Sequence, residues 1–316
     1  MRSRRKSVNK KTVFLSTAIA VALFVSLIIT TFSKLNIDLL PDWGSIFNDT
    51  VLATQGIKAP DDPLTVHFID VGQGDCILIK YESTNILIDS GEKGNGDTVT
   101  NYLDHQGIET LDYVIATHPH SDHIGSMPEV FEEFKVNNVL IPRLPHNNVA
   151  STKTYESFLS CISASGAKAS YAAVGEGYVS GEMSFEILAP LTQYEELNNM
   201  SVVIRLDFGE TSFLFTGDAQ NESENAMLKS GANLDVDVLK SGHHGSRYSS
   251  STQFLQAVSP ELTVISCGES NSYGHPHEET LKRLENLSSE VLRTDLAGTI
   301  VLGSDGKALS ITCEKN

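Results

Sequence analysis

Histidines gather in three short motifs of this 316-residue sequence, and each motif follows an apolar run that predicts a strand. Seven of the ten histidines fall in these motifs. The densest motif, THPHSDH, offers His118, His120, Asp122 and His123 within six residues. Imidazole and carboxylate groups together suit zinc, manganese or iron. The alternative, a polar turn with solvated histidines, does not explain why four such groups follow one apolar strand.

The spacing in THPHSDH predicts two adjacent metal positions. In an extended backbone, His118 and His120 point to the same side. Asp122 and His123 then lie where a following helix begins, and from there they reach a second ion. Asp218, in FTGD, ends another predicted strand after a glycine, and its carboxylate can bridge two cations with one oxygen to each. The alternative for Asp218 is a common Gly-Asp turn.

Two later motifs bring further histidines to the same site. In KSGHHGS, one of His243 and His244 ligates the second metal while the other serves as an acid or contacts the substrate, and the two roles stay open. In YGHPH, His275 is the stronger candidate, because His277 could simply open the next helix. Asp89, at a predicted strand end, either orients a metal-bound histidine or only forms a turn.

Apolar runs and turn residues predict the elements that position these motifs. Asp97 is the expected N-cap of a helix that ends near residue 106. Strand runs come first and are followed by strands mixed with helices, which favours two packed sheets with helices outside, an α+β fold. The strands are expected at 64–71, 75–81, 84–91, 112–117, 137–142, 170–174, 184–190, 201–208, 211–218, 235–242 and 262–268, with three more at the C-terminus. Helices are expected at about 153–164, 220–230, 250–258 and 278–287.

An apolar segment near the N-terminus predicts a membrane anchor. Residues 12–32 form an uncharged run of 21 residues, which at about 1.5 Å per residue spans a bilayer. Six basic residues precede the run, so the positive-inside rule places residues 1–11 in the cytoplasm. We therefore expect a single-pass protein of the cell membrane, with a linker at 33–62 and an extracellular catalytic domain at 63–316. A cleaved signal peptide is the alternative, but the run is long for one and lacks a small-residue cleavage site.

The charge and the cysteines restrict the function further. Residues 33–316 carry 17 basic and 40 acidic residues, a net charge of about −23. Such a surface argues against broad non-specific binding of long duplex DNA, although it leaves room for a positive, metal-filled cleft. The four cysteines form no C-x-x-C pair, and we expect buried free thiols rather than disulfides. They are Cys76, Cys161, Cys267 and Cys313.

The ordered set of motifs resembles the metallo-β-lactamase superfamily and, more narrowly, the extracellular hydrolase domain of the ComEC family of competence proteins. The resemblance rests on FIDVGQGDCILI, LIDSG, THPHSDHIGS, NNMSVVIRL, FTGD, LKSGHHGS and NSYGHPH, and it covers about residues 64–312. It implies an αββα sandwich with the site at one edge of the two sheets, and two divalent metal ions, Zn²⁺ or alternatively Mn²⁺. The implied ligands are His118 and His120 for the first metal, Asp122, His123 and His243 or His244 for the second, and Asp218 as the bridge.

This sequence departs from the family pattern in two places. A further histidine often precedes the bridging aspartate in the superfamily, but here Asn198, Asn199 and Ser201 stand at that place, so we expect the first metal to be held more weakly. The chain also has one hydrophobic span in place of the multi-helix channel of full ComEC proteins, so a separate membrane channel protein is an expected partner. The expected substrate contacts are Lys240, Ser246, Asn199 and Ser201.

Together these features predict a metal-dependent hydrolase, a phosphodiesterase or nuclease that acts outside the cell through a metal-bound hydroxide. Asp122, His244 and His275 are the expected catalytic residues, with His244 or His275 protonating the leaving group. Single-stranded DNA or a small phosphoester fits the acidic charge better than a long duplex. The alternatives are hydrolysis of a cell-wall phosphodiester such as a teichoic acid, hydrolysis of a lactam or lactone, and a surface binding protein that retains the metal site without catalysis.

Overall fold

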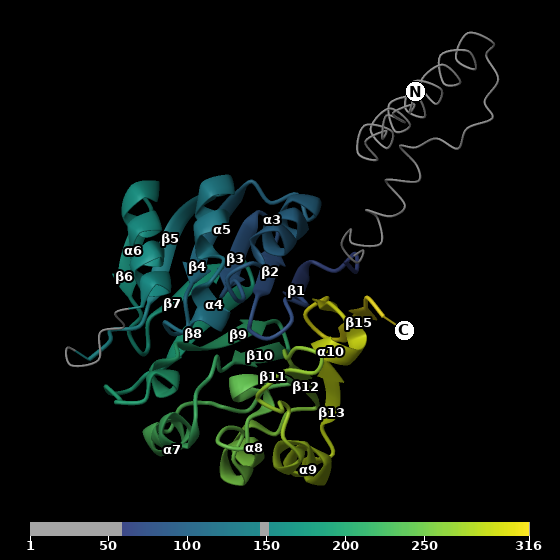
Figure 1. Ribbon diagram of the computed structural model, residues 1–316. Coiled ribbons are helices and arrows are strands. Elements are labelled where there is room, and N and C mark those ends of the chain that lie inside the picture. Colours follow the sequence, from purple (N-terminus) through teal and green to yellow (C-terminus); the bar gives the residue numbers. More distant parts are fainter. Residues whose placement is uncertain (1–58, 146–151, 316) are drawn as a thin grey trace, which may run out of the picture. The chain divides into compact units, whose positions relative to one another are not determined.

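Two mixed β-sheets face each other across an apolar core in the computed structural model (Figure 1). The structure describes residues 59–145 and 152–315, and no helix among these residues is long and apolar enough to cross a membrane. The expected cytoplasmic segment, the anchor at 12–32 and nearly all of the linker lie outside the described residues, so they stay predictions. The α+β sandwich with helices on both outer faces confirms the expected fold class.

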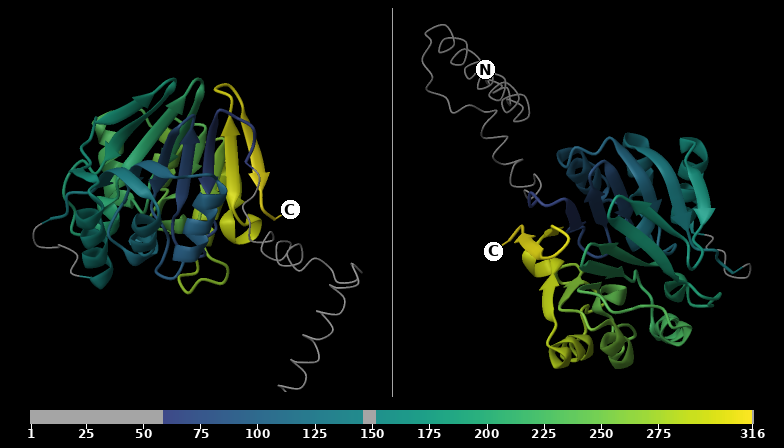
Figure 2. Two further views of the ribbon diagram at one scale, coloured as in Figure 1. Left: turned by 90° about the horizontal axis from the view of Figure 1, so that it is seen from above. Right: turned by 180° about the vertical axis from the view of Figure 1, so that it is seen from behind.

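The first sheet has eight strands in the order β15-β14-β1-β2-β3-β4-β5-β6. Pairs from β15 to β3 are antiparallel, and pairs from β3 to β6 are parallel. Figure 2 shows β14 and β15 beside β1, at the end of the sheet away from β6. The strands are β1 (Leu64–Phe68), β2 (Ile77–Tyr81), β3 (Thr84–Ile88), β4 (Thr110–Ile115), β5 (Lys135–Ile141), β6 (Lys168–Tyr171), β14 (Ile300–Ser304) and β15 (Leu309–Cys313).

The second sheet has seven strands in the order β13-β12-β11-β10-β9-β8-β7. Here β10 to β13 pair in parallel, and β7 to β10 pair antiparallel. Its strands are β7 (Gly177–Ser180), β8 (Met183–Ala189), β9 (Val203–Phe208), β10 (Thr211–Phe215), β11 (Val238–Lys240), β12 (Leu262–Ile265) and β13 (Glu290–Arg293).

Helices cover the outer face of each sheet (Figure 1). On the eight-stranded sheet they are α3 (Gly96–His105), α5 (Met127–Glu133) and α6 (Lys153–Ser165). On the seven-stranded sheet they are α7 (Asn221–Ser230), α8 (Thr252–Val258) and α9 (Glu278–Leu287). Short helices α4 (Ser121–Ile124), η2 (Leu197–Met200), η3 (Gly242–Gly245) and α10 (Thr294–Ala297) lie in the connections.

The alternation of side chains along the strands explains this layering. In β10, Phe213 and Phe215 enter the core between the sheets, whereas Leu214 faces the cluster under α7 and α8. Successive side chains of a strand point to opposite faces, so a strand covered on both sides must be apolar throughout. Phe213, Leu214 and Phe215 meet that requirement. The two polar side chains that open the run are also buried, and both are hydrogen-bonded.

The expected strands and helices are present with shifted ends. The structure adds strand β7, helix α5 and the short helices η2, η3 and α10. The expected N-cap at Asp97 is wrong, because α3 begins at Gly96 with Asn95 in the N-cap position. A side chain at Gly96 would collide with the side chain of Glu129, so α3 and α5 are in close contact at this point. The expectation of free thiols is confirmed for all four cysteines, of which Cys76 and Cys267 are buried.

Candidate metal centre

The four histidine and aspartate motifs meet at one edge of the two sheets. THPHSDH follows β4 of the first sheet, and the other three motifs follow β10, β11 and β12, which are parallel neighbours in the second sheet. Parallel strands end at the same edge, which is where ligands bind in open sheets of this kind. Segments more than a hundred residues apart in sequence are thereby brought together.

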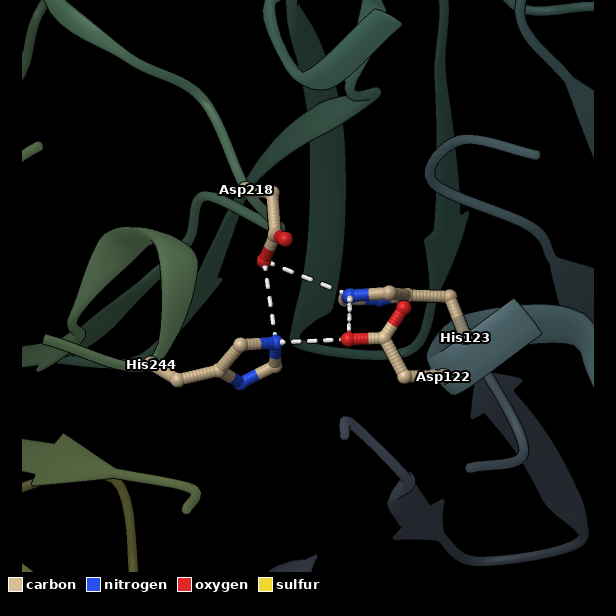
Figure 3. A group of neighbouring side chains, drawn as sticks. All are labelled: Asp122, His123, Asp218 and His244. Carbon is tan, nitrogen blue, oxygen red and sulfur yellow. Dashed lines mark ion pairs between the residues drawn. The ribbon is translucent and has the colours of Figure 1, made fainter. Parts of the chain in front are cut away.

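Four side chains form a compact cluster at this edge (Figure 3): Asp122, His123, Asp218 and His244. One ligand atom from each lies within 4.8 Å of the others. The Nε2 atoms of His123 and His244 are 3.3 Å and 3.5 Å from Asp218 Oδ1. His244 Nε2 is also 3.3 Å from Asp122 Oδ2. Two carboxylates and two imidazoles thus point at one position.

The hydrogen bonds of this cluster are incomplete in a way that fits a divalent cation. His123 Nε2, His244 Nε2 and Asp218 Oδ1 are buried and have no hydrogen-bond partner. Buried polar atoms almost always have a partner, so three convergent exceptions require an explanation. A cation at the centre of the cluster would accept a lone pair from each of them. The residues present therefore fit a metal ion with oxygen and nitrogen ligands.

Both cluster histidines are oriented by hydrogen bonds from the far side of the ring. His123 Nδ1 donates to Asp89 Oδ2 at 2.7 Å, and Thr117 donates to the same carboxylate from its N and Oγ1 atoms. His244 Nδ1 donates to the carbonyl oxygen of Ser266 at 3.0 Å. Each Nδ1 then carries the proton, so each Nε2 presents its lone pair to the cluster. Of the two roles considered for Asp89, the hydrogen bond to His123 matches the one in which Asp89 orients a histidine of the cluster.

The second oxygen of Asp218 faces another pair of histidines. The Nε2 atoms of His118 and His243 are each 3.7 Å from Asp218 Oδ2. His118 Nε2 is also 3.0 Å from His120 Nδ1. The structure therefore brings all seven expected ligands together and separates the two adjacent histidines, because His244 belongs to the compact cluster and His243 lies by the other oxygen. Asp218 stands between the two groups, as a bridging carboxylate must.

The turn that carries His243 and His244 has an unusual backbone. Their φ angles are 48° and 54°, in the left-handed region that residues with a side chain rarely adopt. Such strained conformations concentrate at functional sites. The turn directs both imidazoles towards Asp218 although they are neighbours in sequence. Nothing in the sequence pattern HHG indicates this conformation.

Charges within the cluster shift its pKa values strongly. Burial lowers the pKa of His244, but the carboxylates of Asp218 and Asp75 outweigh burial and raise it to about 10. The pKa of His123 is raised well above its usual range against burial by Asp218 and Asp89. Burial raises the pKa of Asp218, but the facing histidines hold it well below its usual value. Without a cation, protons on the imidazoles balance the carboxylates.

A cavity of about 440 Å³ opens onto this cluster. Six of the predicted site residues line it: His120, Asp122, Asp218, His243, His244 and His275. Sequence reasoning did not identify Gln73, Thr152, Thr154 and Tyr273, which complete the wall together with Pro119, Ser121 and Asn198. Gln73 and Tyr273 could have been found, because they lie in the motifs FIDVGQGDCILI and NSYGHPH.

The four expected substrate contacts do not reach the cavity. The Lys240 ammonium is buried and lies 2.7 Å from Asp75 Oδ2, and it also donates to the carbonyl oxygen of Ser241. Ser201 Oγ accepts from the backbone N of Asp218 at 3.0 Å. Both side chains are occupied by protein groups and do not line the cavity, and their expected role as substrate contacts stays a prediction.

The other two residues of that set also brace the backbone. Asn199 Oδ1 accepts from the backbone N of Gln220 at 3.0 Å and of Ser223 at 3.2 Å. Ser246 is buried, and its Oγ accepts from the backbone N of Tyr248. Both residues therefore shape the loops beside the metal centre and do not form its surface.

The YGHPH motif divides into one cavity residue and one helix-capping residue. His275 lines the cavity, its Nδ1 has no hydrogen-bond partner, and its ring centroid is 5.2 Å from that of His243. Burial and the neighbouring histidines lower its pKa to about 4. His277 precedes α9 in the N-cap position and accepts from the backbone N of Arg247. The preference for His275 over His277 as a site residue agrees with this arrangement.

Comparison with known proteins agrees with the fold and the motifs. Residues 69–153 match the model of the metallo-beta-lactamase superfamily. The ComE operon protein 3 of Bacillus subtilis is 33% identical over 254 residues, which cover 74% of this chain and 32% of that protein. The competence protein ComA of Neisseria gonorrhoeae is 30% identical and is covered to 33%. This chain therefore spans about a third of the length of the curated relatives that it matches.

A solved structure supports the same fold at low sequence identity. The diiron β-hydroxylase CmlA of Streptomyces venezuelae superimposes with a TM-score of 0.53 at 14% identity, over 78% of this chain and 55% of that chain. At this identity the likeness concerns the fold alone. The fold, the arrangement of the His and Asp motifs and the competence relatives agree: this chain carries a ComEC-like domain with the metallo-β-lactamase fold.

Proposed function

We propose that this protein is a metal-dependent phosphodiesterase that acts outside the cell, with single-stranded nucleic acid as its substrate class. The observation that carries the proposal is the convergence of Asp122, His123, Asp218 and His244, a group in which three buried ligand atoms have no hydrogen-bond partner. The histidines on the other oxygen of Asp218 favour a second cation beside the first. Zn²⁺ is the proposed ion and Mn²⁺ the alternative.

The charge of the buried groups favours an anionic substrate of low charge. Lys240 and Asp75 form a buried ion pair and cancel each other. Three carboxylates remain, those of Asp89, Asp122 and Asp218. Two divalent cations would leave a net charge of about +1, which a phosphodiester with its single negative charge neutralises. No lysine or arginine lines the cavity among the described residues, so the cations would supply its positive charge.

The protein groups around the cavity have distinct tasks in this hydrolysis. When bound, the cations would lower the pKa of a coordinated water and offset the charge that develops on the phosphoryl oxygens. Asp218 and Asp122 hold negative charge at their centre, and Asp89 keeps His123 in the ligating tautomer. His275 faces the cavity from the second sheet, where it can donate a hydrogen bond to the leaving group.

The relatives support a place in competence, the uptake of DNA by cells. Competence is printed in the name of the Neisseria relative, and the Bacillus relative is named after the ComE operon. We further propose that residues 12–32 anchor the protein in the cell membrane and that a membrane channel protein is its partner. The acidic charge of the chain favours single strands over long duplexes.

The proposal is tested on the full chain, purified in mild detergent, with bis(p-nitrophenyl) phosphate as the substrate. Turnover should be absent after chelation, return with Zn²⁺ or Mn²⁺, and be lost in Asp122→Ala. The matched control is Asp305→Ala, in an exposed turn of the β14–β15 hairpin. Two bound metals without turnover, together with hydrolysis of a lactam or lactone, would replace the phosphodiesterase by a carbonyl hydrolase. A protein that binds no metal would contradict the proposal entirely.

A further inference from the structure

An exposed aromatic ring stands at the mouth of the cavity. Tyr273, on the loop after β12, lines the cavity, yet 64% of it is exposed. Its ring lies nearly parallel to that of His275, with centroids 5.7 Å apart and an interplanar angle of 20°. His275 in turn contacts His243 edge to face. Three rings therefore lead from the rim of the cavity to the metal centre.

The loop that carries Tyr273 is held in place by its own side chains. Asn271 Oδ1 accepts from the backbone N of His275 at 3.0 Å, and Asn271 Nδ2 donates to the carbonyl oxygens of His275 and Gly268. The backbone N of Gly268 donates to Gln73 Oε1, which ties the loop to the first sheet. A ring fixed before binding loses little conformational freedom when a ligand stacks on it.

Because the chain is acidic and its cavity, in the part of the chain that the structure describes, lacks lysine and arginine side chains, stacking on an aromatic ring becomes the main source of affinity for a nucleic acid beyond the metal centre. Proteins that bind single strands usually combine a basic groove with aromatic platforms. Here the chain has a net charge of −17, and no lysine or arginine is among the described residues that line the cavity. Attraction to the phosphates beyond the metal centre is therefore weak, and an exposed, pre-positioned ring gains importance.

We propose that Tyr273 is the stacking platform for a nucleobase next to the phosphodiester that is hydrolysed. This proposal rests on the proposed function and names the residue that would recognise its single-stranded substrate. In a duplex the base faces are covered by their neighbours, so a base must be unstacked to reach the ring. A polyol phosphate polymer such as a teichoic acid has no flat group to place there.

The test compares two oligomers that differ only in their bases, a fluorescent oligothymidylate and an abasic strand of equal length. The full chain in detergent, loaded with Mn²⁺ or Zn²⁺, should prefer the oligothymidylate. Tyr273→Ala should lower kcat/KM on it by about 5- to 150-fold, the usual range for one stacked base, and leave the abasic strand unaffected. Tyr273→Phe should restore the preference, because the aromatic face is retained.

A matched control separates stacking from a general surface effect. Tyr248 is also 59% exposed and does not line the cavity, so Tyr248→Ala should behave as the wild type. Equal losses on both oligomers in Tyr273→Ala, or no loss on either, would overturn the stacking proposal. Faster hydrolysis of a glycerol phosphate polymer than of the oligothymidylate would overturn it as well.

The failure of the proposed function would be visible separately. If neither the wild type nor any variant hydrolyses the oligothymidylate with either metal, nucleic acid is excluded as the substrate of the proposed phosphodiesterase. The stacking proposal is then tested by the affinities of the two oligomers. Fluorescence anisotropy of the same two oligomers gives the affinities of the metal-loaded protein. A preference for the oligothymidylate that disappears in Tyr273→Ala supports the platform, and equal affinities for both oligomers overturn it.

Discussion

The two oxygens of Asp218 face two differently built halves of the metal centre. Around Oδ1, the cluster of Asp122, His123 and His244 is compact, and both imidazoles are oriented by acceptors behind them. Around Oδ2, the nearest imidazole atoms are 3.7 Å away. We call these groups the Oδ1 half and the Oδ2 half.

The two adjacent histidines differ in exposure, although the other histidine of the Oδ2 half, His118, is buried. The side chain of His243 is 21% exposed, whereas that of His244 is 1% exposed. His243 Nδ1 lies 3.2 Å and 3.4 Å from the amide nitrogens of Gln220 and Asn198 in place of a carboxylate or carbonyl acceptor. A ligand that is oriented and buried loses less freedom when it binds a cation. We therefore expect the two positions to bind metal with unequal affinity, and we expect the Oδ1 half to bind its cation more tightly.

The largest expected effect comes from removing the residue that both halves share. Asp218→Asn should abolish tight binding of both cations, and hydrolysis should fall by more than the roughly 10- to 100-fold typical of a residue that only orients a ligand. Metal content by mass spectrometry and turnover measure the two effects. Asp207→Asn is the control, since Asp207 pairs with Arg205 away from the cavity. Two tightly bound cations in Asp218→Asn would contradict the bridging position.

The adjacent histidines test the comparison itself. His244→Ala should remove the tighter of two binding events in a calorimetric titration with Zn²⁺, because a buried ligand of the Oδ1 half is lost. His243→Ala should retain that event and weaken the other. Identical titrations of the two variants would show that the halves do not differ in the way their geometry indicates.

Asp89 tests the bracing of the Oδ1 half. Asp89→Asn keeps the shape of the side chain but weakens its bond to His123 Nδ1, so the affinity for the tighter cation should fall by about 10- to 100-fold. His243 does not contact Asp89. The weaker of the two metal-binding events should therefore change less. An unaltered tighter affinity, measured by competition with a chelating dye, would remove Asp89 from this role.

The dependence of metal binding on pH tests the charge balance of the Oδ1 half. In the metal-free protein the pKa of His244 is raised to about 10 and that of His123 lies well above its usual range, so both rings carry protons that a cation must displace. Affinity should therefore rise with pH, by about tenfold per pH unit for each proton displaced. Calorimetry in buffers of different ionisation enthalpy counts these protons. An affinity independent of pH between 6 and 8 would contradict the charge balance described for the cluster.

Much of the metal centre could be predicted because its ligands are local in sequence. His118, His120, Asp122 and His123 follow one strand, and their chemical types alone indicate a cation. The consecutive apolar residues of runs such as FLF likewise indicate a strand buried on both faces. What escaped prediction depended on distant partners. Lys240 is an example, because its ion-pair partner Asp75 lies far away in the sequence and is brought to it only by folding.

The sequence by itself determined the fold class, the chemical nature of the ligands and the strands that deliver them, because side-chain chemistry and the period of hydrophobicity act over a few residues. Only the tertiary structure decided which of His243 and His244 joins the compact cluster. That choice depends on the strained turn and on the carbonyl of Ser266, 22 residues from His244. The orientation of an imidazole is determined by its hydrogen-bond partners, and folding alone brings these partners together.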